Sequence, residues 1–182
     1  MNRTRRAILA GLLVALIVAA GYALAGVPNV ELVTLLVFVS GFLLGPGLGA
    51  VVGGAAWLLH STLNPLGAAA PPVLAAQVLC GAVIGLAGAV VGRPLLSLRS
   101  RPAAAVAYGL TGLVLTAVYQ VLVNAAAFVT FADRDAQRAF WGFMAAGLAF
   151  TATHLVWNTA VFLVAARPVL SALDRYRGEL GP

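Results

Sequence analysis

The sequence predicts an all-α protein, a polytopic membrane helix bundle of about six transmembrane helices with both termini in the cytoplasm. Of the 182 residues, 62% are hydrophobic and only 9% are charged, and the mean hydropathy is +1.02. A water-soluble domain of this size would have to build its exterior from the same apolar side chains. Apolar stretches of membrane-spanning length also recur along the whole chain. We therefore expect residues 1–182 to form a single integral membrane domain.

The first part of the chain contains three expected spans. A helix needs about 20 apolar residues to cross the hydrocarbon core, and residues 7–26 meet this length. Residues 30–63 would form a rod of about 50 Å as one helix, which is longer than a bilayer is thick. The Gly-Pro-Gly sequence at 45–47 therefore predicts a tight helical hairpin, with spans at 30–45 and 48–63.

The second part of the chain contains three further expected spans. Residues 73–92 lie between a pair of prolines and an Arg-Pro sequence, both of which are typical of helix ends. Residues 103–131 and 139–166 are longer than the bilayer requires, so we expect these helices to tilt or protrude. The last span is expected to end before Arg167-Pro168.

The arginines indicate the topology. With six spans, most of them fall on the side that also holds both termini: Arg3, Arg5, Arg6, Arg93, Arg99, Arg101, Arg167, Arg175 and Arg177. The positive-inside rule places this side in the cytoplasm, and we expect a multi-pass protein of the plasma membrane. The first span resembles a signal peptide, but we expect it to be retained because its removal would reverse this charge balance. No basic run with interleaved aromatic residues indicates a nucleic-acid partner.

Small residues recur at every fourth position of the first span and form one stripe along the helix. They are Ala7, Gly11, Ala15, Ala19 and Ala23. In a membrane, such stripes let two helix backbones approach closely. The stripe is consistent with a partner interface or with packing inside this chain.

Polar side chains at membrane depth are the candidates for a substrate-binding site, because they cost free energy and usually face a cavity or a partner. They are Asn29, Glu31, His60, Asn64, Tyr119, Gln120, Asn124, Thr151, His154 and Trp157. Three pairs of polar residues, starting at His60, Gln120 and His154, have the four-residue spacing of one helix face. We expect the set to surround a pocket that opens outward. The alternative is that each residue only bridges helices.

The residues do not predict an enzyme. No nucleophile elbow, phosphate-binding loop or pair of buried carboxylates occurs, so no catalytic residue is predicted. The two histidines lie in different spans without a ligand set, and no metal site is predicted. We also expect no directly bound cofactor.

The chain resembles the substrate-binding S component of energy-coupling factor (ECF) transporters along nearly its whole length. The segments that carry the resemblance are Pro28-Asn29-Val30-Glu31-Leu32-Val33-Thr34, Ser40-Gly41-Phe42-Leu43-Leu44-Gly45-Pro46-Gly47-Leu48-Gly49-Ala50, Asn64-Pro65-Leu66-Gly67 and Pro71-Pro72. The resemblance implies capture of a vitamin or related micronutrient and coupling to a transmembrane T subunit and two ATPase subunits, which use the ATP. Ala15-Leu16-Ile17-Val18-Ala19 is similar to the Ala-x-x-x-Ala face that contacts the T subunit in this family.

Two other functions remain open from the residues. The chain is also compatible with a structural or assembly protein of the membrane, whose polar residues only pack helices. A small transporter that works without partners is the second alternative.

Overall fold

The computed structural model describes residues 2–65, 67–131 and 136–177, and every regular element in these ranges is helical. This confirms the predicted all-α fold. The elements are α1 (Arg3–Ala23), α2 (Val33–Leu44), α3 (Pro46–Thr62), α4 (Pro71–Leu96), α5 (Arg101–Phe131), α6 (Ala136–Val161), the π-helical turn η1 (Phe162–Ala166) and α7 (Arg167–Arg177).

Among the described residues, four helices are long and apolar enough to cross a membrane: α1, α4, α5 and the rod that runs through α6, η1 and α7. Their outer surfaces carry large apolar side chains, such as Leu12 at 63% exposure, Val121 at 65% and Val129 at 75%. Water would penalise such an exterior, whereas lipid is a matching solvent for it. These helices indicate a multi-pass membrane protein.

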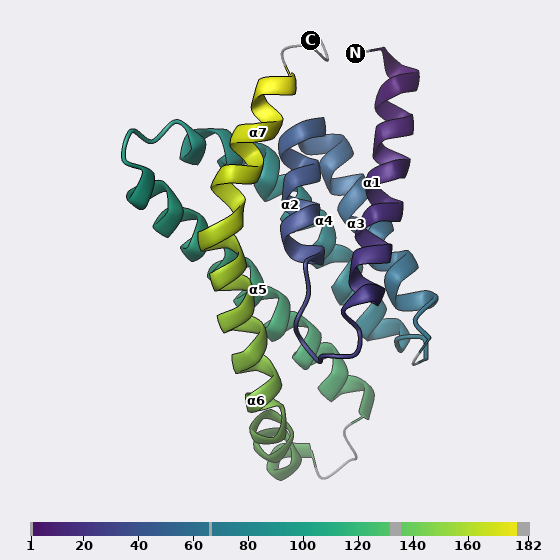
Figure 1. Ribbon diagram of the computed structural model, residues 1–182. Helices are drawn as coiled ribbons and strands as arrows, with labels where there is room; N and C mark the ends of the chain where they lie inside the picture. The colour runs from purple at the N-terminus through teal and green to yellow at the C-terminus, as the bar shows by residue number, and fades with distance from the viewer. Residues whose placement is uncertain (1, 66, 132–135, 178–182) are drawn as a thin grey trace.

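The start of α1 and the end of α7 lie at the same end of the molecule (Figure 1). At this end α7 packs against η1 and also contacts α2, α4 and α5. The Arg6 guanidinium donates a 2.6 Å hydrogen bond to the carbonyl of Leu44, which joins the start of α1 to the end of α2. We refer to this as the arginine-rich end, because Arg3, Arg5 and Arg6 lie in the first turn of α1 and Arg175 lies near the end of α7.

A sharp break separates α2 from α3 at the predicted position. Gly45 has a φ of 84°, which favours glycine, and its amide still bonds the carbonyl of Gly41. Pro46 then occupies the first turn of α3, where its missing N–H costs nothing. The two helices therefore form a hairpin around one residue.

Glycines let α2, α3 and α4 pack with their backbones in contact. A Cβ atom on Gly85 of α4 would overlap the carbonyl oxygen of Gly49 in α3, and one on Gly41 of α2 would overlap the carbonyl of Gly85. The same holds for Gly53 and Gly81, which lie four residues after Gly49 in α3 and four residues before Gly85 in α4. Such close approach maximises van der Waals contact, which drives helix association in lipid.

The predicted end of the sixth span before Arg167-Pro168 is wrong as a helix end, because the helix continues to Arg177. The ring of Pro168 would collide with the carbonyl of Val164 in a regular α-helix. Val164 lies in η1, whose π-helical turn has wider i to i+5 bonding and relieves this conflict. Leu170, beyond the proline, is fully buried.

The helix of the fourth span also ends later than predicted. It was predicted to end at residue 92, but α4 runs through Pro94 to Leu96. The Tyr108 hydroxyl donates a 2.6 Å hydrogen bond to the carbonyl of Gly92, which supports the backbone just before the proline.

Helix α2 is short, and this creates room for a site. It has 12 residues, or about 18 Å of length at ~1.5 Å per residue, against a hydrocarbon core of about 30 Å. The span was expected from residue 30, but the Glu31 carboxylate accepts the amide of Thr34, and α2 therefore begins only at Val33. Residues 24–32, which we call the connector, run without regular helix between α1 and α2.

We predict that Gly85→Ala destabilises the protein by about 1–3 kcal/mol, because the added methyl group must push apart α3 and α4. Thermal unfolding in a mild detergent, followed by size-exclusion chromatography, measures the loss. Gly47→Ala is the matched control, since its Cβ meets nothing within 4 Å. Equal midpoints for the two variants would contradict the close packing described above.

Candidate binding site

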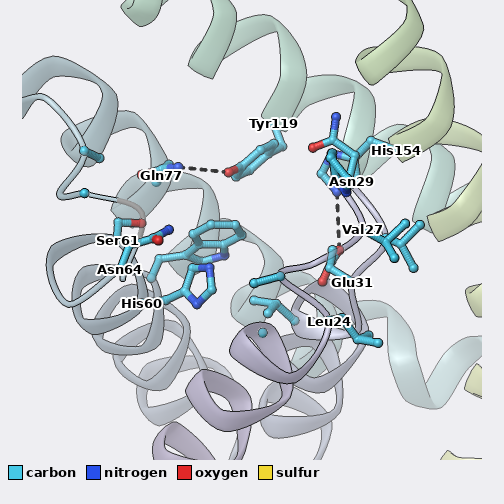
Figure 2. A pocket seen from close by; sticks show the side chains of 18 residues that line it. Leu24, Val27, Asn29, Glu31, His60, Ser61, Asn64, Gln77, Tyr119 and His154 are labelled. Atoms are coloured by element: carbon cyan, nitrogen blue, oxygen red, sulfur yellow. Dashed lines mark hydrogen bonds and ion pairs between the residues drawn. The ribbon is translucent and has the colours of Figure 1, made fainter.

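A cavity of about 350 Å³ lies between the connector and helices α3 to α6. Figure 2 shows His60, Ser61, Asn64 and Gln77 on one side and Asn29, Glu31 and His154 on the other, with Tyr119 between them. The connector contributes one wall, the last two turns of α3 another, and α4, α5 and α6 contribute one polar or aromatic side chain each. Its volume is at the lower end of the range for small-molecule sites.

Hydrogen bonds attach the connector to α6. Asn29, at a φ of 61°, donates its side-chain amide to the carbonyl of Phe150 at 2.7 Å. The Trp157 indole donates to the backbone carbonyl of Glu31 at 2.7 Å. The Asn158 amide donates to Glu31 Oε1 at 2.7 Å. The position of this cavity wall therefore depends on one face of α6.

Glu31 is the acidic residue of this site, and both of its carboxylate oxygens are occupied. Oε2 accepts the amide of Thr34 at 2.9 Å, where the N-terminal dipole of α2 also favours a negative charge. Oε1 accepts from Asn158 and lies 3.4 Å from Nε2 of His154. Burial by itself would raise the pKa of Glu31, but the hydrogen bonds from His154, Thr34 and Asn158 outweigh it and hold this pKa below its usual value. These contacts favour the ionised form of the Glu31 carboxylate.

Four aromatic rings form a continuous wall from α3 to α6. The Trp57 ring lies 4.9 Å from that of Tyr119 and 5.6 Å from that of His60. The Tyr119 ring in turn meets His154 edge to face at 5.5 Å. His60 also stacks on Tyr22 of α1, and the centroids of these two rings are 4.9 Å apart. Such faces suit stacking with a flat ligand.

Five of the residues that line the cavity carry a buried polar atom that has no hydrogen-bond partner. These atoms are Trp57 Nε1, His60 Nδ1, Ser61 Oγ, Gln77 Oε1 and His154 Nδ1. A buried polar atom without a partner costs about 1–3 kcal/mol. Native proteins rarely concentrate such atoms at one place unless water or a ligand supplies the partners.

The structure brings six of the ten sequence-predicted site residues to the cavity. They are Asn29, Glu31, His60, Asn64, Tyr119 and His154. The pair His60 and Asn64 therefore shares the cavity, as its spacing on one helix face indicated. In the pair His154 and Asn158, His154 lines the cavity and Asn158 holds Glu31 from behind.

The remaining four predicted residues lie outside the cavity wall. Trp157 anchors the connector through the carbonyl of Glu31. Asn124 donates to the hydroxyl of Thr151 at 3.4 Å and so bridges α5 and α6. Gln120 is buried on α5 away from the cavity. For Asn124 and Thr151, the geometry is that of the helix-bridging alternative.

Sequence reasoning missed three lining residues with polar or aromatic side chains, Trp57, Ser61 and Gln77. Trp57 and Ser61 share the face of α3 that carries His60, since positions 57, 60 and 61 follow the helical repeat, and Asn64 lies just beyond the end of α3. This spacing was a usable signal. Gln77 is an amide inside an otherwise apolar helix, which also marks a candidate.

The small-residue stripe lies on the outside of the protein. Ala7, Gly11, Ala15, Ala19 and Ala23 are all exposed, whereas Leu13, Ile17 and Gly21 on the opposite face of α1 are buried. The stripe therefore does not serve packing inside this chain.

Among the described residues, no group of three or more His, Cys, Asp and Glu side chains is placed to hold a metal ion. Comparison of the chain with protein-family models and with curated proteins finds no match. The assignment of function therefore depends on the cavity and on the exposed faces.

We predict that Trp157→Phe loosens the connector, because it removes the indole donor to Glu31 while keeping an aromatic ring in place. A lost hydrogen bond of about 1–1.5 kcal/mol corresponds to roughly fivefold to tenfold faster amide exchange. Hydrogen exchange of residues 24–32, read by mass spectrometry, measures this change.

Thr153→Val is the matched control on the same helix. The Thr153 hydroxyl is exposed and bonds only the carbonyl of Ala149 in its own helix, so exchange in the connector should remain unchanged. Unchanged exchange in Trp157→Phe would show that the connector does not depend on this anchor.

Proposed function

We propose that this protein is the substrate-capturing membrane subunit of an ECF-type importer for a vitamin or related micronutrient. The observation that carries the proposal is the cavity lined by five side chains with unpartnered buried polar atoms. Residues that only bridged helices would satisfy one another, as Asn124 and Thr151 do. The unpartnered set instead needs partners from outside the chain.

The proposed membrane arrangement has six crossings, formed by α1, α2, α3, α4, α5 and the rod from α6 to α7. The arginine-rich end faces the cytoplasm of a prokaryote by the positive-inside rule. The cavity then opens toward the outside, because the connector lies at the far end of α1 from its arginines. A solute would therefore enter from outside, and no enzymatic step is included in the proposal.

The exposed stripe of α1 supports a partner of the T-subunit type. Its small side chains offer a smooth surface for close helix contact, and no neighbouring helix of this chain covers it. In the proposed complex, two ATPase subunits supply the energy, and the T subunit transmits their motion to α1. The S component would then tilt to open its cavity inward.

Retention of a small molecule by the purified protein tests the proposal. We expect gently purified wild-type protein to release a small molecule when it is denatured, and mass spectrometry detects this compound. The Ser61→Ala variant should retain about threefold to tenfold less of it. Because the Ser61 hydroxyl has no partner in the protein, its removal should leave the thermal midpoint equal or higher. Thr62→Val is the control, since that hydroxyl is exposed and bonds its own helix.

The outcomes separate the alternatives. If no preparation retains a compound and Ser61→Ala lowers stability, the chain is a structural or assembly protein. If vesicles that contain only this chain accumulate the retained compound, it transports without partners. Either result overturns the proposed function.

We predict that Ala15→Trp together with Ala19→Trp reduces partner-dependent uptake of the retained compound at least tenfold. Two indoles on the exposed stripe would hold a partner helix away from α1. Binding to the isolated variant should remain unchanged, because both positions face away from the cavity. Ala125→Trp, at an exposed alanine of α5, is the matched control, and uptake that survives both stripe substitutions would show that the interface lies elsewhere.

A further inference from the structure

We infer that the cavity takes an amino-substituted nitrogen heterocycle of zero or positive net charge. This inference rests on the proposed function and narrows its substrate class. Three properties of the cavity carry it: the charge of its wall, the shape of its aromatic surface and the mixture of donors and acceptors that need partners.

The charge of the wall disfavours an anion. Among the described residues that line the cavity, none is lysine or arginine, and Glu31 is the acidic one. His154, Asn158 and the Thr34 amide already surround the Glu31 carboxylate. The wall therefore offers no lysine or arginine that could bind a carboxylate or phosphate group of a ligand. A ligand anion would enter a partly dry site beside a fixed negative charge, whereas a cation or neutral molecule would not be repelled.

The aromatic wall favours a flat ring. Trp57 and Tyr119 form its centre, and both rings belong to residues that line the cavity. A flat heterocycle packs well against such rings, and a positively charged one gains further attraction where it meets a ring face. The cavity volume of about 350 Å³ limits the ligand to a small ring system with few substituents.

The unpartnered atoms are of both donor and acceptor type, so a ligand that reaches them has to offer both roles. Trp57 Nε1 can only donate, so it needs an acceptor such as a ring nitrogen. Gln77 Oε1 can only accept, and its amide nitrogen already bonds the Tyr119 hydroxyl at 3.2 Å, so it needs a donor such as an exocyclic amine. Ser61 Oγ can take either role. An amine beside a ring nitrogen supplies both roles on one edge of a flat molecule.

Three quinolines of matched shape test the inference on the full-length protein in lipid nanodiscs at pH 7, with affinities measured by equilibrium dialysis. The probe 2-aminoquinoline carries the amine beside the ring nitrogen, 2-methylquinoline lacks the donor, and quinoline-2-carboxylate carries a negative charge. We expect 2-aminoquinoline to bind at least tenfold more tightly than the carboxylate and about fivefold more tightly than the methyl compound.

Three variants and a control assign these preferences to residues. Gln77→Leu should abolish the preference for amine over methyl, and Glu31→Gln should reduce the discrimination against the carboxylate. Trp57→Leu should weaken all three probes. Thr62→Val should change nothing, since its hydroxyl bonds its own helix on an exposed surface.

The inference is overturned if the carboxylate binds as well as the amine, or if none of the three probes binds. It is also overturned if the compound retained by the wild-type protein carries a net negative charge. These results leave the proposed function intact as long as a retained compound is taken up with the partner subunits. Absence of both retention and uptake would instead remove the proposed function itself.

Discussion

The hydrogen bonds that Glu31 accepts are the interactions on which the rest of the site depends. One of its carboxylate oxygens starts α2 at the amide of Thr34, and the other receives Asn158 of α6. Its backbone carbonyl receives Trp157. A buried carboxylate without partners would be very costly, so the connector, α2 and α6 must keep these positions together. A residue near the start of the chain thereby fixes the last long helix and one wall of the cavity.

Side-chain size along α3 separates a tightly packed part of the bundle from the part that lines the cavity. Gly49 and Gly53 bring α3 against the backbone of α4 in the half nearer the arginine-rich end. Trp57 still packs against Gly81 of α4, and together with His60 and Ser61 it lines the cavity. The glycine contacts therefore hold α3 and α4 together, and the cavity lies between this end of α3, the connector and α6.

Much of the fold could be predicted from the sequence, because hydropathy and glycine-proline breaks reflect local physics. The break at Gly45 and the alignment of Ala15 and Ala19 in one stripe both follow from the sequence, whereas the outward orientation of this stripe is shown only by the structure. The continuation of the last helix through Pro168 could not be predicted, since it depends on a π-helical turn that packs Phe162 in the core. Within the site, spacing predicted His60 and Asn64 correctly as neighbours. Spacing alone could not distinguish this pair from Gln120 and Asn124, because only tertiary packing decides which polar pair lines a cavity.

The shortness of α2 has a consequence for the permeation path. Under the proposed function, a solute held beside Glu31 already sits at the depth where α2 begins. The barrier that remains toward the cytoplasm is then only the length of this helix, about 18 Å, instead of the full hydrocarbon core of about 30 Å. Part of the translocation distance is covered by diffusion from outside, before any energy is expended, and a modest rocking motion suffices for the remainder.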